Sequence, residues 1–579
     1  MCGIIGYAGR RDAGPVIIGG LRKLEYRGYD SFGFAVSGSE VSIYKKKGRI
    51  SDFDPTLFDK KGHFGIGHTR WATHGVPDDR NAHPHMDCSG KIAIVHNGIV
   101  ENYAELRKQM IDEGHLFSSD TDSEIIAHLV EKYLDSDLLS ALSMAVKHLE
   151  GAYAILAVCQ DDNRVVAARQ SSPLVLGIGD GEIFASSDIT PLIEYTHKVI
   201  FLEDGDIAAF DASNYIIHNS GAEVQRKSEN IDWDVDSARM GGFDHFMLKE
   251  IFEEPDVFYN SFYSKPEREV VAEIKKAGGI TVVGCGTSYH AAMVFRYLME
   301  KYAGIPTLVD IASEISYFKL KSDSFMIAVS QSGETADTLT ALKQATASGC
   351  ITLAITNVCG SSITRVADYS HFMRAGPEIS VAATKSFIAQ VAVFMRLVSE
   401  LSDNNLCQKY SGIHKVIDDC LLTDMDEAVS MCMKAKNLFF IGRGPYYPVS
   451  LEGALKMKEI TYIHAEGYPA GELKHGPFSL LDESTPVIAV CPHHDSRALM
   501  LSNIREIKSR GAPVIALGGV GDIDLEDIVD IFIQLPKAPE NVDIISSSII
   551  LQLLAYRTAV ALGRDVDKPR NLAKSVTVV

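Results

Sequence analysis

The chain has 579 residues, several times the roughly 100 to 200 residues of one domain, so two or three separate cores are expected. Hydrophobic residues make up 46% of the chain and charged residues 23%, which is typical of a globular protein and excludes a long disordered tail. The net charge of −20 would repel phosphate backbones and anionic lipid headgroups. We therefore expect no nucleic-acid partner and no role at a membrane surface.

The sequence suggests neither a membrane span nor a secretory signal. The most apolar stretch, 543–562, is interrupted by Ser, Gln and Arg557, so we expect no spanning helix. The first residues lack a basic segment followed by a long apolar one, which predicts a cytoplasmic location. The ten cysteines form no CxxC pair, which argues against both a disulfide framework and a structural zinc site. We accordingly expect no metal and no organic cofactor.

The first 240 residues contain short β-like runs separated by Gly, Asp and Asn turn signals, which predicts layered antiparallel sheets. The clearest runs are 41–44, 91–95, 152–157 and 165–168. Two longer periodic segments, near 101–114 and 122–150, predict helices packed on these sheets. The polar segment 222–248 contains adjacent glycines, so we predict a domain junction near residue 240.

Beyond the junction, the pattern changes to an apolar strand, a glycine-bearing turn and a long helix, which indicates parallel αβα layering. This pattern occurs twice. Residues 280–289 align with 438–447, and two later strands follow at a similar offset, 326–330 with 487–491 and 353–355 with 515–517. The C-terminal part is therefore predicted to be a tandem duplication.

In the first repeat, one strand runs into a turn that carries three hydroxyl side chains and a glycine before a predicted helix. The turn contains Ser330, Gln331, Ser332, Gly333 and Thr335. Free N–H groups and the dipole at a helix start favour an anion, although the same hydroxyls would serve equally as helix caps. The second repeat lacks this arrangement at 491–496, and no Gly-Lys-Ser/Thr ending marks a nucleotide P-loop. We predict a sugar monophosphate, with Thr287 and Ser288 of the neighbouring turn as further contacts.

Cys2 stands directly after the initiator methionine. If that methionine is removed, the α-amine of Cys2, with a pKa of about 8, can act as a base on its own thiol. Considered alone, a cysteine at position 2 is more simply an accident of sequence.

The surrounding motifs change that reading, because they resemble those of class II glutamine amidotransferases. They are CGIIG at 2–6, EYRGYDS at 25–31, HTRWATHG at 68–75 and HNGIVEN at 96–102. The resemblance implies an α+β N-terminal-nucleophile hydrolase domain, an αββα sandwich, over 2–240. The duplicated part resembles sugar isomerase (SIS) domains, which implies two α/β domains with parallel sheets, over 241–410 and 411–579.

In the first domain, the resemblance assigns roles to residues that match its motifs. Cys2 is the nucleophile, and the Asn97 amide and Gly98 N–H form the oxyanion hole. Arg70 and Asp122 would hold the α-carboxylate and α-amine of glutamine, as their charges suit. Trp71, Thr73 and His74 belong to a loop that closes over glutamine.

In the second repeat, Glu452, Lys456 and Glu459 fall at i, i+4 and i+7 on one face of a predicted helix. Three such charges often mark only a solvated face. The resemblance instead implies that Glu459 moves a proton between sugar carbons 1 and 2, with Lys456 beside it and Glu452 contacting the substrate. It further implies that His475 assists ring opening and that Lys574 forms a Schiff base with the ketose.

The combination of domains resembles enzymes that convert fructose 6-phosphate and glutamine into glucosamine 6-phosphate and glutamate. In that family Ser330, Gln331, Ser332 and Thr335 match phosphate contacts, and Arg570 matches a position in the substrate-binding tail. The resemblance also implies a homodimer in which His475 is lent to the other subunit. Two alternatives stay open: an amidotransferase for a different sugar phosphate, and a non-enzymatic SIS regulator that senses a sugar phosphate.

Overall fold

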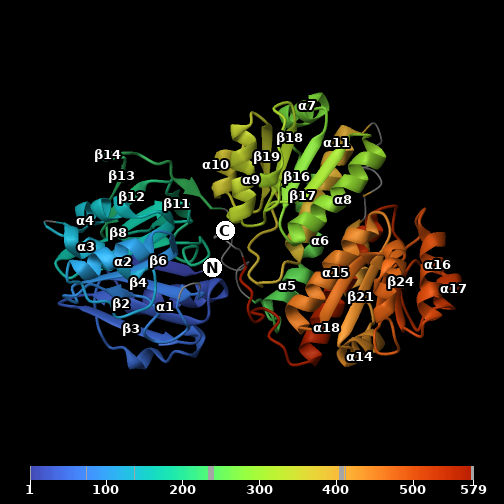
Figure 1. Cartoon of the computed structure of the whole chain (residues 1–579), viewed down its shortest axis with the longest axis horizontal. Coiled ribbons are helices and arrows are strands. Elements are labelled where there is room, and N and C mark those ends of the chain that lie inside the picture. The colour runs from blue at the N-terminus through green and yellow to red at the C-terminus, as the bar shows by residue number, and fades with distance from the viewer. Residues whose placement is uncertain are drawn as a thin grey trace. The chain divides into compact units, whose positions relative to one another are not determined.

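The computed structural model describes residues 2–72, 75–135, 137–231, 240–402, 410 and 413–574. These residues form two compact units (Figure 1). The first comprises the described residues up to 231 together with Ala573 and Lys574, and the second runs over Met240–Leu572.

The first unit contains two antiparallel sheets. The eight-stranded sheet has the order β15-β11-β9-β10-β1-β4-β2-β3, and the seven-stranded sheet has the order β14-β13-β12-β8-β7-β6-β5. The strands of the larger sheet are β1 (Gly3–Gly9), β2 (Ser31–Ser37), β3 (Val41–Lys47), β4 (Phe64–Arg70), β9 (Val175–Ile178), β10 (Glu182–Ser186), β11 (Lys198–Phe201) and β15 (Glu229–Asn230). Those of the smaller sheet are β5 (His85–Met86), β6 (Ile92–Val100), β7 (Gly151–Cys159), β8 (Asp162–Gln170), β12 (Asp206–Phe210), β13 (Tyr215–Asn219) and β14 (Ala222–Glu223).

The two sheets pack face to face because their strands are apolar on both sides. Ile4 and Ala8 of β1 share a core with Val95 and Leu156 of the other sheet. The outer face of the larger sheet is covered by α1 (Ala13–Leu24), and that of the smaller one by three helices. These are α2 (Tyr103–Asp112), α3 (Glu124–Tyr133) and α4 (Leu138–Ala145). The expected αββα sandwich is confirmed.

The prediction of one helical segment over 122–150 is wrong, because α3 ends at Tyr133 and α4 begins at Leu138. The side chain of Asp137 accepts hydrogen bonds from the N–H groups of Leu139 (3.1 Å) and Ser140 (3.3 Å) and so caps a new helix. Hydrophobic periodicity continues across the break and therefore does not report it.

The second unit contains two five-stranded parallel sheets, with the orders β17-β16-β18-β19-β20 and β22-β21-β23-β24-β25. The first comprises β16 (Ile280–Gly284), β17 (Thr307–Ile311), β18 (Phe325–Val329), β19 (Ile351–Thr356) and β20 (Tyr369–Phe372). The second comprises β21 (Asn437–Gly442), β22 (His464–Pro469), β23 (Val487–Val490), β24 (Val514–Gly518) and β25 (Ile531–Gln534). The orders correspond strand for strand, which confirms the predicted duplication.

Helices cover the parallel sheets of both repeats. The first repeat contributes α5 (Phe246–Phe252), α6 (Glu254–Tyr263), α7 (Arg268–Lys276), α8 (Thr287–Tyr302), α9 (Ala336–Ala347), α10 (Ser362–Val366) and α11 (Lys385–Leu401). The second contributes α13 (Ile413–Leu421), α14 (Asp426–Lys434), α15 (Tyr446–Thr461), α16 (Arg497–Lys508), α17 (Ile523–Glu526) and α18 (Val542–Ala561). Phe295 and Phe394 belong to the same continuous core as Phe440 and Leu553. The repeats are thus fused through one hydrophobic core.

The stretch 543–562, expected to be too interrupted to form a long apolar helix, lies almost entirely in the helix α18. It has 20 residues and is apolar enough, by length and composition, to cross a bilayer. However, 83% of its most apolar window is buried inside the unit, as expected of a helix at the centre of a protein core. It is the one helix of this kind among the described residues.

Candidate active sites

Cys2 lies just before β1, beside the end of β4. The N–H of Trp71 donates to its Sγ at 3.2 Å, and the thiol lies 3.4 Å from the Trp71 carbonyl oxygen. Burial raises the pKa of the Cys2 thiol, while the charge of Arg70 opposes this shift. The thiol is therefore held in position but needs a base to become a nucleophile.

The segment 25–31 supports the backbone that holds Cys2. Asp188 accepts hydrogen bonds from Tyr26 and Arg27, both at 2.7 Å, and so fixes the start of the segment. A Cβ on Gly28 would lie 2.7 Å from the Trp71 nitrogen, so only glycine allows this close approach. The carboxylate of Asp30 accepts from the Ala72 N–H at 2.9 Å. The motif thus positions residues 70–72, which in turn contact the thiol.

The Asn97-Gly98 pair in β6 brings polar donors from the second sheet to Cys2. The Asn97 side-chain amide donates to the Cys2 carbonyl oxygen at 2.9 Å. Gly98 has a φ of +140°, and a Cβ there would collide with the Ala152 carbonyl oxygen. This arrangement can supply a side-chain and a backbone donor to an oxyanion formed near Cys2.

Arg70 and Asp122 are buried, with exposed fractions of 3% and 4%, so they are not ordinary surface charges. Arg70 donates to the Gly75 carbonyl oxygen at 3.0 Å, and burial lowers its pKa against the opposing charges of Cys2, Asp30 and Asp122. Asp122 accepts from the Val100 N–H at 2.8 Å. Trp71 is half-buried and packs edge-on against Tyr29. Thr73 and His74 lie outside the described residues.

Sequence reasoning missed a buried histidine cluster under this site. His68 stacks on His83 with ring centroids 4.0 Å apart, and His83 contacts His85 at 4.5 Å. His96 reaches Asp122 through the Ser123 hydroxyl, with distances of 2.8 and 3.3 Å. Burial lowers the pKa of all four histidines, that of His85 to about 3. The sequence signal that could have found this cluster is the concentration of histidines within residues 68–96.

The cluster predicts acid sensitivity of the first unit. Above pH 6.5, His85 is neutral in both folded and unfolded chains, so it adds no pH dependence. Between about 6.5 and 3, only the unfolded chain binds its proton, so the free energy of unfolding falls by about 1.4 kcal/mol per pH unit on acidification. We expect His85→Gln to reduce this slope by the contribution of about one titrating group. The glutamine amide can still form a hydrogen bond with Thr121.

Denaturant unfolding at several pH values, followed by tryptophan fluorescence, measures the slope, because both tryptophans precede residue 240. The exposed His63, replaced by glutamine, is the matched control. An unchanged slope in His85→Gln would show that His85 does not stay neutral in the folded chain.

In the second unit, the hydroxyl-rich turn follows β18. Ser330 and Thr335 share a hydrogen bond of 2.9 Å, and the Ser330 hydroxyl accepts from the Gly333 N–H at 3.1 Å. Gly333 has a φ of +67°, and a Cβ there would collide with the Ser361 hydroxyl. Thr335 occupies the N-cap position of α9 but makes no side-chain cap bond to that helix's described first turn. The capping alternative is therefore not favoured, and the helix start is suited to an anion.

In the charged stripe on α15, Glu452 and Lys456 are buried and Glu459 is half-buried, so the stripe is not a solvated face. Glu452 and Lys456 are 2% and 1% exposed, and the Lys456 ammonium lies 3.3 Å from Glu452 and 2.7 Å from Glu459. Burial opposes the charge of Lys456, but the two carboxylates outweigh it and raise the lysine pKa. Lys456 is thus a fixed cation that orients Glu459.

This stripe joins the two repeats. The Thr287 hydroxyl at the start of α8 donates to Glu452 at 2.9 Å, and Lys456 donates to the same hydroxyl at 3.3 Å. His290 lies 2.8 Å from the second oxygen of Glu452. Ser288 instead accepts from the Gln390 amide at 3.0 Å. The sequence predicted only the spacing of the three charged residues on α15. It did not predict the contacts that this helix makes with α8.

Three further predicted residues lie on segments other than α15. His475 is exposed at the end of a 3-10 turn, Ala470–His475, and no hydrogen bond or ion pair joins it to Glu459 within the described chain. Arg570 stacks on the ring of Tyr462 at 4.3 Å. Lys574 is grouped with the first unit. The roles assigned to these residues stay predictions.

Comparison with known proteins places this architecture in a family. A family model described as a glutamine amidotransferase domain matches residues 68–194, and one described as an SIS domain matches 273–400 and 431–562. The glutamine–fructose-6-phosphate aminotransferases (isomerizing) of Methanothermobacter thermautotrophicus and Chlorobaculum tepidum are 47% and 44% identical, over all of both chains. The C-terminal domain of glucosamine-fructose-6-phosphate aminotransferase from Francisella tularensis covers 57% of this chain and 100% of its own, with 35% identity and a TM-score of 0.53. The chain belongs to the family of glutamine–fructose-6-phosphate aminotransferases (isomerizing).

Proposed function

We propose that the chain converts fructose 6-phosphate and glutamine into glucosamine 6-phosphate and glutamate. Family membership over the full length supports this proposal. The observation that carries it is the pair of built centres. In one, the Trp71 N–H holds the Cys2 thiol and the Asn97 amide donates to the Cys2 carbonyl oxygen. In the other, Lys456 pairs with both Glu452 and Glu459.

In the first unit, the Cys2 thiol passes its proton to the α-amine freed when Met1 is removed. The resulting thiolate attacks the side-chain amide carbon of glutamine, and the α-ammonium returns the proton to the departing nitrogen. The Asn97 amide and the Gly98 N–H stabilise the negative oxygen. Arg70 holds the α-carboxylate of glutamine and Asp122 its α-ammonium group. Collapse of the intermediate releases ammonia and leaves a thioester, which water hydrolyses to glutamate.

In the second unit, the phosphate binds at the start of α9, where Ser330, Gln331, Ser332 and Thr335 surround free N–H groups. Lys574, from the C-terminal tail of the chain, forms an imine with the ketose carbonyl and releases water, and ammonia then displaces the lysine amine at carbon 2. Glu459 transfers a proton from carbon 1 to carbon 2, which yields the aldose form of the amino sugar. Lys456 keeps the Glu459 carboxylate in place, and His475 assists ring opening.

The remaining assignments belong to the same proposal. The exposed position of His475 suits a residue that acts in the partner subunit of a homodimer. We place the domains at 2–240, 241–410 and 411–579 and the enzyme in the cytoplasm. The alternative most similar to this proposal is the same reaction on another sugar phosphate, because the selectivity of the pocket depends on contacts that the motifs do not fix.

One coupled assay tests the proposal. The full chain is supplied with glutamine and, in turn, fructose 6-phosphate and other ketose phosphates, and glutamate and amino sugar phosphate are measured together. We expect one glutamate per glucosamine 6-phosphate formed, with fructose 6-phosphate preferred. Faster amination of a different ketose would overturn the substrate assignment, whereas sugar binding without turnover would favour a regulatory role.

A further inference from the structure

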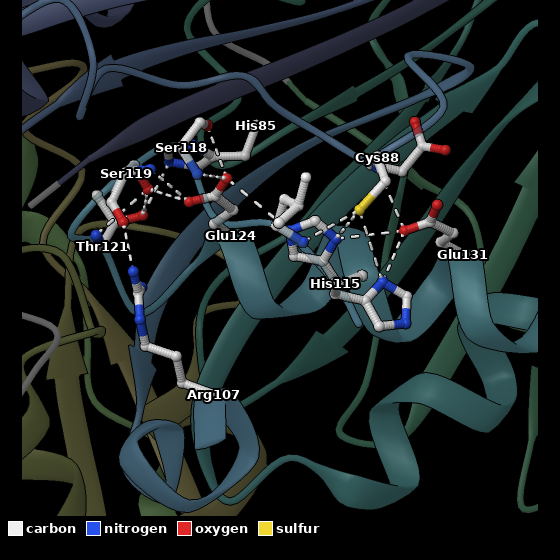
Figure 2. Close-up of polar contacts among 12 residues, drawn as sticks. His85, Cys88, Arg107, His115, Ser118, Ser119, Thr121, Glu124 and Glu131 are labelled. Carbon is white, nitrogen blue, oxygen red and sulfur yellow. Dashed lines mark hydrogen bonds and ion pairs between the residues drawn. The ribbon is translucent and has the colours of Figure 1, made fainter. Parts of the chain in front are cut away.

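A second group of reactive side chains lies in the first unit and has no part in the proposed reaction. Cys88, His115, His128 and Glu131 place one ligand atom each within 4.8 Å of one another. Figure 2 shows Cys88, His115 and Glu131 of this group. Cys88 belongs to the turn between β5 and β6, and His115 follows α2. His128 and Glu131 lie one turn apart on α3, so they point from the same helix face.

The distances in this cluster match the edges of a tetrahedral metal site. The Cys88 sulfur lies 3.8 Å from Nδ1 of His115 and 3.6 Å from Nδ1 of His128. One oxygen of Glu131 lies 2.9 and 3.3 Å from the same two nitrogens. Zinc bonds of about 2.3 Å to sulfur and about 2.0–2.1 Å to nitrogen or oxygen, at tetrahedral angles, place S and N about 3.6 Å apart and N and O about 3.3 Å apart.

Hydrogen bonding alone does not account for this convergence. Both imidazoles direct Nδ1 at the same sulfur and the same carboxylate oxygen, but one N–H can donate well to only one of them. A metal ion between the four atoms would satisfy all of them at once. The cluster therefore has the geometry of a ligand set.

The surroundings of His128 support the same reading. Its side chain is 1% exposed, and its Nε2 faces an oxygen of Glu124 at 3.8 Å. Glu124 is itself fixed by the N–H and hydroxyl groups of Ser118 and Ser119, each at 2.7 Å (Figure 2). A carboxylate beyond the far nitrogen favours the tautomer with its proton on Nε2, which leaves Nδ1 available as a metal ligand.

We propose that Cys88, His115, His128 and Glu131 bind one Zn²⁺ ion in a closed, structural site. A thiolate, two imidazoles and a carboxylate form a nitrogen–sulfur–oxygen set that suits zinc, and four protein ligands leave no open position for catalysis. On binding, the Cys88 thiol loses its proton to solvent. The thiolate and the carboxylate then balance the charge of the ion.

The site would connect three segments: the turn at Cys88, the segment after α2, and α3. Asp122 stands two residues before α3 begins, so the metal would also stabilise the segment that carries the proposed glutamine-binding carboxylate. Only the consequence for Asp122 rests on the proposed function. The binding of the metal is independent of that function.

Metal content and cobalt spectroscopy on the full chain test the inference. The protein is stripped with a chelator, and Zn²⁺ is then added and counted per chain by mass spectrometry. Co²⁺ is titrated separately and followed by thiolate-to-cobalt charge-transfer absorption. We expect one ion per chain, a thiolate band, and a melting temperature that rises with added Zn²⁺.

Variants identify the ligands. Cys88→Ser should lose the cobalt–thiolate band, and Glu131→Gln should weaken zinc binding by at least the roughly 10- to 100-fold cost of losing an outer-shell partner. Cys359→Ser replaces another exposed cysteine and should bind as the parent does. Cys2→Ala should also retain the band, which excludes the nucleophile as its source. Circular dichroism of each variant checks folding.

Two results would overturn the proposal. A parent chain that takes up no zinc after stripping would show that the four groups are only a hydrogen-bonded cluster. Equal zinc affinity and an equal cobalt band in folded Cys88→Ser would place the metal elsewhere. Failure of the coupled sugar assay would leave the metal result unchanged, so the two proposals are tested separately.

Discussion

Replacing Cys2 by alanine should abolish glutamine hydrolysis while the chain continues to aminate fructose 6-phosphate with added ammonium salts. The Trp71 N–H donates to the Cys2 thiol, and the Asn97 amide donates to the backbone carbonyl oxygen of the same residue. Without the thiol, those donors have no tetrahedral intermediate to stabilise. We expect glutamine turnover to fall by at least about 10⁴-fold, as is typical when a covalent nucleophile is removed.

The measurement compares glutamate release and amino sugar formation with glutamine or with ammonium as the nitrogen source. Cys359→Ser should leave both rates at the parental value. Mass spectrometry of the mature protein supplies a second check, because the mechanism needs the amine of Cys2 to be free. Parental glutamine hydrolysis in Cys2→Ala would remove this residue from the mechanism.

Replacing Glu459 by glutamine should stop amino sugar formation from either nitrogen source. The amide keeps the size of the side chain but cannot accept the proton from carbon 1. Loss of a positioned base costs about 10²- to 10⁴-fold in rate. Glutamine hydrolysis should survive, although uncoupled from synthesis, because the Cys2 site does not contain Glu459.

Replacing Lys456 gives a contrasting result, which distinguishes a loss of catalysis from a loss of stability. Lys456→Met would leave Glu452 buried without its cation, which typically costs about 3–5 kcal/mol of stability. We therefore expect that variant to unfold more readily, while Glu459→Gln keeps the parental melting temperature. Glu526→Gln, an exposed glutamate on α17, is the neutral control. Undiminished synthesis by Glu459→Gln would assign the proton transfer to another group.

The fold was largely predictable from local pattern. The two αβα repeats follow from apolar strands that recur at a near-constant offset, and the hydroxyl-rich turn before α9 follows from the residues around Gly333. Each of these signals lies within a few consecutive residues. The break between α3 and α4 was missed because one capping side chain, Asp137, decides it within an otherwise continuous apolar pattern.

Contacts between distant segments were not predictable in this way. Thr287 and Glu452 are 165 positions apart, and nothing near either residue indicates the other. The histidines at 68–96 and the ligand set around Cys88 are likewise assembled by strand pairing and helix packing. Burial distinguishes a functional cluster on α15 from a solvated charged face. Burial is a property of the folded unit and is not visible in the sequence.

The shared core of the two repeats restricts how this half of the protein can be divided. A fragment ending between them would expose the apolar surfaces of α8 and α11 that α15 and α18 otherwise keep dry. A fragment beginning there would leave the Glu452 carboxylate without its hydroxyl donor. Such fragments should aggregate rather than fold. Fusion into one chain also guarantees equal numbers of both copies, so each copy can diverge in sequence without losing its partner.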